Sequence, residues 1–425
     1  MKKDNILVFP AGTEISFEIF NALKDSKFIT LFGGTSIDDH SLMVYERIIK
    51  NFPFVDDDNF IAYLNEVIKK YNIDYIYPAH DSVVVTLTEN EDKILSKVIS
   101  TDINTVNICR SKEKTYAYFE GEDFIPETYE SEDLIDFPVF LKPKVGQGSQ
   151  GARIIKSREE LEIYYTESDI LCEYLPGEEI TVDCYTDTTG NLKVVSPRIR
   201  LRIRNGIAVK TKNIPVTDEI KSIAQRLNKK LIFKGAWFFQ LKKDKKGNYK
   251  LLEVSPRIPG TMGLSRNKGI NFPMLSIYAN KGIECKIIEN NYDIVLDRAF
   301  INRYKIDIDY SKVYVDLDDT LILNDKVNLT LITFLYQCVN KHKKIYLLTK
   351  HAKNIEETFN KHKISKDIFT AIYHINPEDK KYKYIDSSDS IFIDDSFAER
   401  LEVKEKLHIN VFDVDMIESL LDWRR

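Results

Sequence analysis

The sequence lacks the features of several large protein classes. Its five cysteines are far apart and show no CxxC or related metal-ligand spacing, so reduced thiols are expected rather than a disulfide framework. No stretch approaches the roughly 20 apolar residues that a membrane-spanning helix needs. The short apolar run at residues 6–9 indicates a first β-strand rather than a signal peptide. A net charge of −5 argues against a generally basic nucleic-acid-binding protein. We therefore expect a cytoplasmic protein without a membrane or nucleic-acid partner.

Common signatures of nucleotide and metal sites are absent as well. The chain contains neither a Walker A loop nor a Rossmann glycine fingerprint, and it shows no internal repeat. The seven histidines form no cluster with metal-ligand spacing. His80 follows a predicted strand beside Asp81, where an ordinary loop histidine is favoured over a substrate contact. Function must therefore be sought in less common motifs.

The pattern of strands and helices predicts a multidomain protein that combines α/β and α+β folds. Residues 1–105 alternate strand and helix, which indicates a parallel α/β domain whose loops at 10–14 and 78–82 lie at the carboxyl ends of strands. Residues 106–295 contain strands and glycine-containing hairpin turns, as expected of an α+β domain with antiparallel sheets. Residues 296–310 are expected to be a linker, and residues 311–425 form a third unit of strands and helices.

The segment 139–153 in the middle domain resembles a phosphate-binding hairpin. A predicted strand delivers Lys142, and the loop that follows contains Gly146, Gly148 and Gly151. Glycines allow backbone N–H groups to approach phosphate oxygens, and a lysine supplies the opposite charge. Taken alone, the loop could equally be a structural hairpin.

Polar residues further along the chain favour the phosphate interpretation. Gln240 ends one predicted strand, and the next strand carries Glu253, Ser255 and Arg257 on one face because side chains alternate along a strand. Oxygen ligands suit Mg²⁺, and a guanidinium group suits phosphate. The alternative is an exposed strand face held by salt bridges.

The order of these motifs over residues 1–295 resembles the ATP-grasp superfamily, in particular its carbamoyl phosphate synthase large-subunit-like branch. The resemblance implies that Lys114, Lys142 and the Gly146–Gly151 loop bind ATP phosphates, with Arg257 steadying the transferred phosphoryl group. It further implies adenine contacts at Glu173 and Leu175, a ribose contact at Glu179, and Mg²⁺ ligation by Gln240, Glu253 and Ser255. Family members usually have asparagine where this chain has Ser255. The implied reaction activates a small-molecule carboxylate as an acyl phosphate, which an amine then captures.

Four arginines alternate along the predicted strand at residues 198–204. Arg198, Arg200, Arg202 and Arg204 would share one face and repel each other unless anions lie nearby. Three interpretations remain open: a part of the ATP and acyl-phosphate site, a solvated face paired with acids, or a nucleic-acid contact. The segment has no aromatic residue for base stacking, which disfavours the last interpretation.

The third unit has polar residues at the ends of three predicted strands. Asp316 and Asp318 end the first, Thr349 ends the second, and Asp394 and Asp395 end the third. Carboxylates gathered at the carboxyl ends of strands require a cation nearby. Lysines 380, 381 and 383 precede the third strand.

This arrangement resembles the haloacid dehalogenase superfamily of phosphohydrolases, over residues 311–425. The resemblance implies a Rossmann-like domain with a minimal cap, since few residues lie between Thr320 and Thr349. Asp316 would be the nucleophile and Asp318 the proton donor and later the base. Thr349 would hold phosphoryl oxygens, and Lys381 would be the steadying lysine, with Lys380 as the alternative. Asp394 and Asp395 would complete a Mg²⁺ site with Asp316 and the carbonyl oxygen of Asp318.

Together these patterns predict a bifunctional enzyme with ATP and Mg²⁺ as cofactors. An ATP-dependent carboxylate–amine ligase is joined to a phosphatase that acts on a phosphorylated small molecule, and a homodimer is compatible with the sequence. The alternative hypothesis is a nucleotide-sensing regulator that binds ATP and phosphorylated ligands without turnover.

Overall fold

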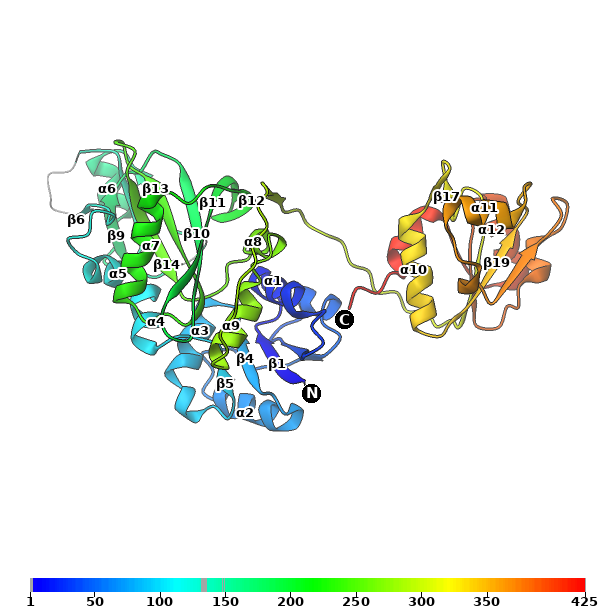
Figure 1. The fold of residues 1–425 in the computed structure, drawn as a ribbon, viewed down its shortest axis with the longest axis horizontal. Coiled ribbons are helices and arrows are strands. Elements are labelled where there is room, and N and C mark those ends of the chain that lie inside the picture. The colour runs from blue at the N-terminus through cyan, green and yellow to red at the C-terminus, as the bar shows by residue number, and fades with distance from the viewer. Residues whose placement is uncertain (1–2, 131–135, 147, 149, 425) are drawn as a thin grey trace. The chain divides into compact units, whose positions relative to one another are not determined.

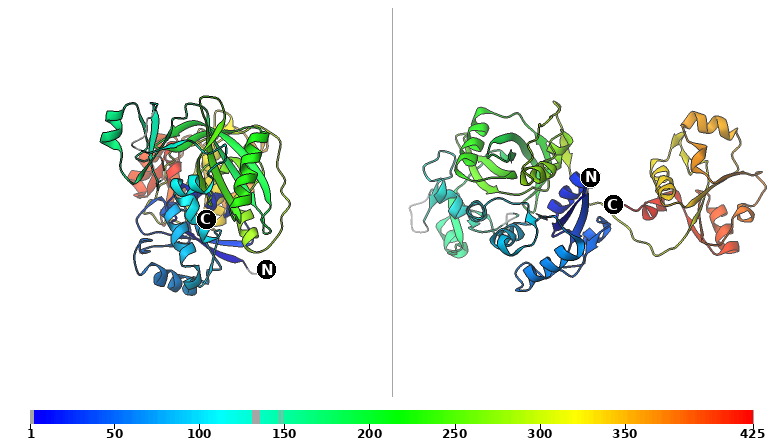
Figure 2. Two further views of the ribbon diagram at one scale, coloured as in Figure 1. Left: turned by 90° about the vertical axis from the view of Figure 1, so that its left-hand side faces the viewer. Right: turned by 60° about the horizontal axis from the view of Figure 1, so that its bottom comes forward.

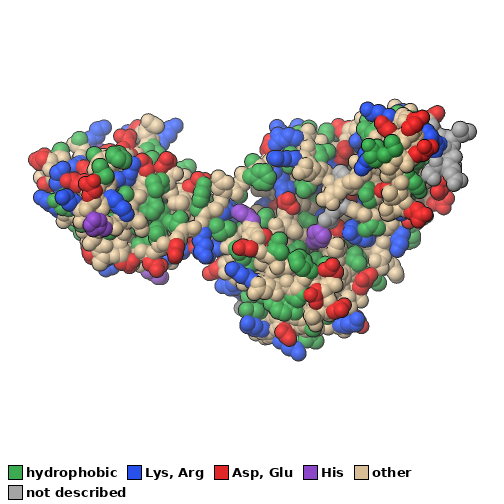
Figure 3. All heavy atoms as spheres, turned by 180° about the vertical axis from the view of Figure 1, so that it is seen from behind, with side chains coloured by type: hydrophobic (Ala, Val, Ile, Leu, Met, Phe, Trp, Pro, Cys, Tyr) green, Lys and Arg blue, Asp and Glu red, His purple; other side chains and the backbone are tan. Residues whose placement is uncertain are grey.

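The computed structural model describes residues 3–130, 136–146, 148 and 150–424. The chain divides into two compact units, Met1–Phe300 and Ile301–Arg424, which are described separately. Within the described ranges, no helix combines the length and the apolar character needed to cross a membrane. On the face shown in Figure 3, acidic and basic side chains are interspersed in both units.

The first unit begins with a parallel sheet of five strands in the order β3-β2-β1-β4-β5. Its strands are β1 (Asp4–Phe9), β2 (Ile29–Gly34), β3 (Ile48–Ile49), β4 (Tyr75–Pro78) and β5 (Lys97–Val98). The helices around it are α1 (Glu14–Leu23), α2 (Phe60–Tyr71), α3 (Asp81–Glu89), α4 (Ile103–Arg110) and α5 (Lys112–Tyr118), with 3₁₀ turns at His40–Met43 and Glu91–Lys93. Figures 1 and 2 show this sheet with its helices.

Alternation along β1 explains why helices cover both faces of the parallel sheet. Ile6 and Val8 pack with α1 in one apolar cluster, whereas Leu7 and Phe9 pack with α2 in another. Strand order reverses between β1 and β4, because the chain leaves β1 toward β2 but returns to pair β4 on the other side. Crevices at such a reversal are the usual ligand sites of open α/β sheets.

Two antiparallel sheets complete the first unit. The smaller has the order β6-β9-β7-β8 and the larger has the order β14-β13-β10-β11-β12-β15. The smaller sheet comprises β6 (Thr128–Tyr129), β7 (Val139–Pro143), β8 (Arg153–Ile155) and β9 (Asp169–Glu173), with α6 (Arg158–Tyr164). The larger comprises β10 (Glu179–Thr186), β11 (Leu192–Arg204), β12 (Ile207–Asn213), β13 (Gly235–Lys243), β14 (Tyr249–Ser255) and β15 (Val295–Asp297), with α7 (Asp218–Lys230), α8 (Gly263–Asn267) and α9 (Phe272–Asn280).

Strand β13 shows how the larger sheet separates its core face from its site face. Trp237 and Phe239 pack under α7, and the Trp237 ring stacks on Phe233 with centroids 4.0 Å apart. Phe238 and Gln240 point to the other side, where they line a cavity. The alternation of β13 thus places Gln240 away from the core and toward ligand.

The second unit is built on a parallel sheet in the order β20-β19-β16-β21-β22, with a separate β17-β18 hairpin. Its elements are β16 (Lys312–Val315), β17 (Ile322–Leu323), β18 (Lys326–Val327), α10 (Leu329–Asn340), β19 (Lys344–Thr349), α11 (Ile355–His362), β20 (Ala371–His374), β21 (Ser390–Ile393), α12 (Phe397–Leu407) and β22 (Asn410–Phe412), with 3₁₀ turns at Lys366–Ile368, Lys381–Tyr384 and Val414–Leu420. Val313 and Val315 pack on one face with α10, and Tyr314 packs on the other with α12. Between β16 and β19 the chain forms only this hairpin and α10.

The expected mixture of α/β and antiparallel architecture is confirmed. Strand β15 lies across the predicted end of the middle domain at residue 295, because it pairs with β12 through Lys210 and Asp297. The predicted linker, residues 296–310, therefore begins inside strand β15 of the larger sheet.

Candidate functional site

The first unit contains a cavity lined by residues of both antiparallel sheets. Eight residues predicted from the sequence to bind ATP or Mg²⁺ line this cavity: Lys142, Gly146, Gly148, Glu173, Leu175, Glu179, Gln240 and Glu253. Gly151 does not line it, although Gln150 and Ala152 do. Gly148 and Gly151 have φ angles of 61° and 75°, a conformation that glycine adopts without strain. Gln147 and Ser149 of the same loop lie outside the described residues.

Lys142 is buried at the floor of this cavity, on β7. Its Nζ donates a hydrogen bond to the hydroxyl of Tyr116 at 2.6 Å, and that hydroxyl donates to the carbonyl oxygens of Leu251 and Leu252. Burial lowers the pKa of Lys142, but Tyr116, Cys172 and Glu253 together outweigh burial and hold the pKa above its usual value. The ammonium group therefore stays charged inside the cavity.

The structure brings Lys112, rather than Lys114, to the cavity. Both belong to α5, but Lys114 is exposed and lines neither this cavity nor the larger one described below. Lys112 lines the cavity, and its Nζ lies 3.4 Å from the carbonyl oxygen of Gly146. Burial lowers the pKa of Lys112, and Glu253 opposes this effect. The phosphate contact predicted for Lys114 stays a prediction, and Lys112 is a second candidate on the same helix.

Gln240 and Glu253 lie opposite each other on β13 and β14. Gln240 Nε2 donates to Glu253 Oε1 at 2.8 Å, and Gln240 Oε1 accepts a hydrogen bond from Arg200 at 2.9 Å. Arg200 also forms an ion pair with Glu179. A chain of polar contacts therefore connects the residue expected at the ribose to those expected at the metal.

Arg257 is fixed by a bidentate ion pair with Asp81, the first residue of α3. Its Nε and Nη2 donate to the two carboxylate oxygens at 2.6 and 2.8 Å, and the Ser255 hydroxyl lies 3.3 Å from one of them. Burial raises the pKa of Asp81, but Arg257 outweighs it and holds the pKa below its usual value. This pair ties the parallel sheet to β14.

A second, larger cavity opens at the reversal of strand order between β1 and β4. Thr13, Glu14, His80 and Asp81 line it from the two loops expected at the strand ends. Gln240, Glu253, Arg200, Gly148 and Gly206 line both cavities. The two cavities therefore meet at the residues expected to hold a metal.

The arginines of β11 do not form one shared face. Arg198 is buried and makes a bidentate ion pair with Asp183 at 2.9 and 3.1 Å. Arg200 lines both cavities, whereas Arg202 is exposed and pairs with Asp297. Arg204 lies over the ring of Phe300, 5.4 Å from its centroid. Irregularities in the β11–β12 register on both sides of Arg202 break the alternation that the sequence suggested.

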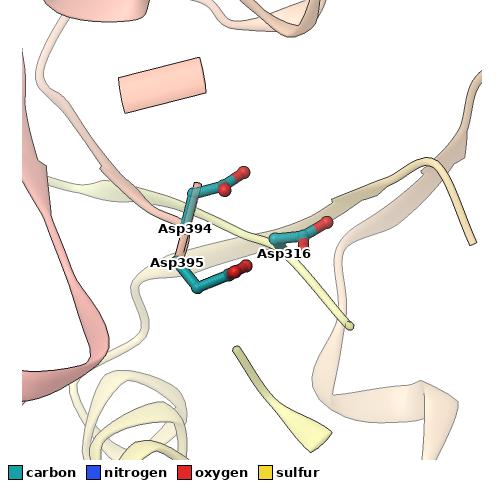
Figure 4. Close-up of side chains that lie close together, drawn as sticks. All are labelled: Asp316, Asp394 and Asp395. Carbon is teal, nitrogen blue, oxygen red and sulfur yellow. The ribbon is translucent and has the colours of Figure 1, made fainter. Parts of the chain in front are cut away.

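In the second unit, three carboxylates converge at the carboxyl ends of β16 and β21. Figure 4 shows Asp394 and Asp395 beside Asp316, and their carboxylate oxygens lie within 4.8 Å of one another. Lys381 bridges two of them, with Nζ at 2.8 Å from Asp316 and 2.6 Å from Asp394. Burial raises the pKa of Asp316 to about 7, although Lys381 opposes this effect. A buried acid group with one lysine is a site that a divalent cation fits.

The other residues predicted at this site lie around the three carboxylates. Thr349 is buried at the end of β19, and Lys380 is exposed and pairs with Glu402. The Thr320 hydroxyl lies 3.1 Å from Asp395 Oδ1 and accepts the backbone N–H of the same residue.

Asp318 is held by His351, which sequence reasoning missed. His351 Nδ1 lies 2.8 and 2.9 Å from the two Asp318 carboxylate oxygens, and its Nε2 lies 2.8 Å from the Thr358 hydroxyl. That hydroxyl donates to the carbonyl oxygen of Asn354 at 3.0 Å, which leaves its lone pair to accept from His351. The position of His351, two residues beyond Thr349 at a strand end, was the signal available in the sequence.

Comparisons with known proteins identify the first unit's fold. Residues 166–297 match the model of a family described as ATP-grasp in the biosynthetic pathway with Ter operon. The biotin carboxylase domain of 2-oxoglutarate carboxylase from Hydrogenobacter thermophilus, crystallised with MgADP, ADP and bicarbonate, has a TM-score of 0.57 at 15% identity, over 69% of this chain and 74% of that one. No curated protein sequence matches the chain.

Two further solved structures share the fold. N5-carboxyaminoimidazole synthetase from Staphylococcus aureus has a TM-score of 0.54 at 15% identity, over 68% of this chain and 81% of that one. L-amino acid ligase from Bacillus licheniformis has a TM-score of 0.53 at 17% identity, over 68% of this chain and 76% of that one. Residues 166–297 are therefore similar to an ATP-grasp family, and at these identities the likeness to the solved structures is one of fold.

The buried pair of Asp183 and Arg198 leads to a stability prediction. Asp183→Asn leaves the Arg198 charge buried without its partner, so we expect the free energy of unfolding to fall by about 3–5 kcal/mol. The exposed pair offers a matched control, since Arg202→Gln should change it by less than about 1 kcal/mol. Urea unfolding in a Trp423→Phe background would make Trp237 fluorescence report on the first unit. Equal losses of unfolding free energy in Asp183→Asn and Arg202→Gln would contradict a stabilising role for the buried Asp183–Arg198 pair.

Proposed function

We propose that the first unit is an ATP- and Mg²⁺-dependent ligase that joins a small-molecule carboxylate to an amine. The observation that carries the proposal is the junction of two cavities at Gln240 and Glu253. One cavity has the lysines and glycines that suit a nucleotide, and the other opens at the strand reversal where substrates bind in α/β folds. Phosphoryl transfer from one to the other would take place at this junction.

The first cavity supplies a separate group for each part of ATP. Lys112 and Lys142 would neutralise phosphate charge beneath the Gly146–Gly151 loop. Glu173 and Leu175 would meet the adenine, and Glu179 the ribose. Arg257, immobilised by Asp81, would stabilise the charge that develops on the transferred phosphoryl group. Because these groups are already paired and oriented, little reorganisation is needed during transfer.

Where the two cavities meet, some of the oxygen atoms are placed to ligate Mg²⁺ and one is not. Glu253 offers a carboxylate and Ser255 a hydroxyl, both hard ligands. Gln240 now directs its amide nitrogen toward Glu253 and its oxygen toward Arg200, so its amide must turn to ligate a cation. When bound, Mg²⁺ would neutralise the transferring phosphates.

The chemistry proceeds in two balanced steps. A substrate carboxylate oxygen attacks the γ-phosphorus of ATP, the bond to the bridging oxygen of ADP breaks, and an acyl phosphate forms. The neutral amine then attacks the acyl carbon, the bond from carbon to the phosphate oxygen breaks, and inorganic phosphate leaves. The amine loses one proton to solvent. An amide, ADP and phosphate result.

We further propose that the second unit is a phosphohydrolase of the haloacid dehalogenase type. Asp316 would attack phosphorus and form an aspartyl phosphate while the alcohol of the ester leaves. Lys381 and the hydroxyl of Thr349 would hold the phosphoryl oxygens. Asp316, Asp394, Asp395 and the carbonyl oxygen of Asp318 would hold Mg²⁺, which would neutralise phosphate charge.

The side chain of Asp318 would protonate the leaving alcohol and then accept a proton from the water that hydrolyses the aspartyl phosphate. His351 contacts both carboxylate oxygens of Asp318 and would orient it. Because α10 packs on the sheet, the cap would be limited to the β17–β18 hairpin, which suits a site reached by a substrate of substantial size.

Lys112 and Lys114 provide a matched test of the nucleotide site. Lys112→Ala should weaken ATP binding by at least about tenfold, because a charge-assisted contact to phosphate is lost. Lys114→Ala, on the same helix, should bind ATP like the wild type. Titration with a fluorescent ATP analogue would measure both affinities. A larger loss of ATP affinity in Lys114→Ala than in Lys112→Ala would support Lys114 as the phosphate-binding lysine.

Separate sites predict separable activities. Glu253→Ala and Lys142→Ala should abolish ADP release stimulated by an acid and an amine, while hydrolysis of p-nitrophenyl phosphate stays near the wild-type rate. A screen of carboxylates and amines for stimulated ADP release supplies the assay. Loss of both activities in a folded variant would contradict independent sites. ATP binding without stimulated release by any pair would favour the nucleotide-sensing alternative.

Substitutions of Asp316 and of Asp318 should impair phosphatase turnover in different ways. Asp316→Asn removes the nucleophile, so no phosphatase turnover is expected. Asp318→Asn removes proton transfer and should slow turnover by about 10²–10⁴-fold, with phosphoenzyme accumulating from esters that have good leaving groups. Mass spectrometry of the trapped protein would locate the phosphoryl group. A phosphoryl group on another residue, or wild-type turnover by Asp316→Asn, would contradict the assignment.

A further inference from the structure

Two opposite charges in the larger cavity form no side-chain hydrogen bond or ion pair within the described part of the chain. Glu14 and Arg298 both line this cavity, and neither makes a side-chain hydrogen bond or ion pair there. They flank Gly260: a β-carbon at this glycine would lie 3.1 Å from Glu14 Cβ and 3.3 Å from Arg298 Nη1. The two charges are therefore close neighbours that do not contact each other directly.

The other arginines of the cavity are already paired. Arg198 is bound to Asp183, Arg200 to Glu179, and Arg257 to Asp81. Their donors are largely used inside the protein. Arg298 is thus the arginine of this cavity that forms no ion pair within the described part of the chain.

Arg298 is fixed at its backbone, although its side chain forms no hydrogen bond or ion pair with the residues that the structure describes. It follows β15, and its N–H donates to the carbonyl oxygen of Val209 on β12 at 2.7 Å. Burial lowers the pKa of its guanidinium, and the nearby carboxylates of Glu14 and Glu18 oppose this effect only in part. Glu18 is itself bound to Arg266. A ligand carboxylate would add the direct ion pair that Arg298 lacks.

Glu14 is fixed by the start of α1. Thr13 caps this helix, accepting the N–H of Ser16, and its hydroxyl donates to the carbonyl oxygen of Ala79 on the neighbouring loop. Glu14 itself is exposed to the cavity side of the helix end. Its carboxylate can therefore accept hydrogen bonds from a cationic group.

We propose that the amine substrate is an amino acid, whose carboxylate binds Arg298 and whose amino group faces Glu14. The proposal rests on the ligase function proposed above and names the substrate class of that same site. An arginine fork matches a carboxylate through two parallel hydrogen bonds. The gap between Glu14 and Arg298 presents one acceptor and one donor group, which is the pattern that a zwitterion complements.

Other ligands match this pair less well. A simple amine offers Arg298 no carboxylate in direct contact, and a simple carboxylate leaves Glu14 beside a second anion. A phosphate ester carries more negative charge and meets stronger repulsion from Glu14. Only a ligand with both charges satisfies both residues.

Binding to the full-length protein in the presence of Mg²⁺ and a non-hydrolysable ATP analogue tests the proposal. Each standard L-amino acid is titrated singly by calorimetry, and the best binder is compared with its carboxamide and with its deaminated acid. The wild type should prefer the amino acid over both derivatives by at least about tenfold. Arg298→Gln should lose the preference over the carboxamide, and Glu14→Gln the preference over the deaminated acid.

Two measurements keep the outcomes distinct. Arg202→Gln, which changes an exposed arginine outside the cavity, should bind the amino acid like the wild type, and all variants should bind the ATP analogue equally. Failure of the wild type to bind the nucleotide would overturn the ligase proposal. Nucleotide binding without amino-acid binding, or with preferences unchanged in Arg298→Gln and Glu14→Gln, would overturn the amino-acid assignment alone.

Discussion

The ion pair between Asp81 and Arg257 connects the two halves of the first unit. Asp81 begins α3 beside the parallel sheet, and Arg257 follows β14 of the antiparallel sheet. Because both side chains are largely buried, removing one would leave an uncompensated charge at a cost of about 3–5 kcal/mol. The pair also lines the larger cavity, so the same contact supports fold and site. Ser255 adds a hydroxyl contact to this pair, which ties β14 to α3 a second time.

The sequence predicted the elements well but not the contacts between distant ones. Alternation placed Glu253, Ser255 and Arg257 on one face of β14, and all three line one small cavity with Lys112. Lys112, rather than the predicted Lys114, lines the cavity because of where α5 begins. Once Ser111 is seen as its N-cap, the spacing of Lys112 and Tyr116 by one helical turn places both on the face toward Lys142.

The arginines of β11 show a different limit of sequence reasoning. Alternation predicts one face, but local irregularities in pairing turn the strand, and the partners of each arginine come from other strands. Asp183 lies on β10, whereas Asp297 belongs to β15, in a stretch that had no recognisable pattern. Ion-pair partners depend on tertiary packing, and no periodicity in one strand reveals them. Arg298 and Glu14, from opposite ends of the first unit, were missed for the same reason.

The two units arrange charge by contrasting means. In the second unit, parallel strands end together, so the sequence positions of Asp316 and Asp394 were enough to predict that they converge. Burial there raises the pKa of Asp316, and a single lysine offsets only part of the negative charge, which favours a divalent cation. In the first unit, most charges of the junction are already neutralised by internal pairs. Glu14 and Arg298 line the larger cavity without forming an ion pair among the described residues, and under the amino-acid proposal they would make this cavity selective for the charge pattern of its substrate.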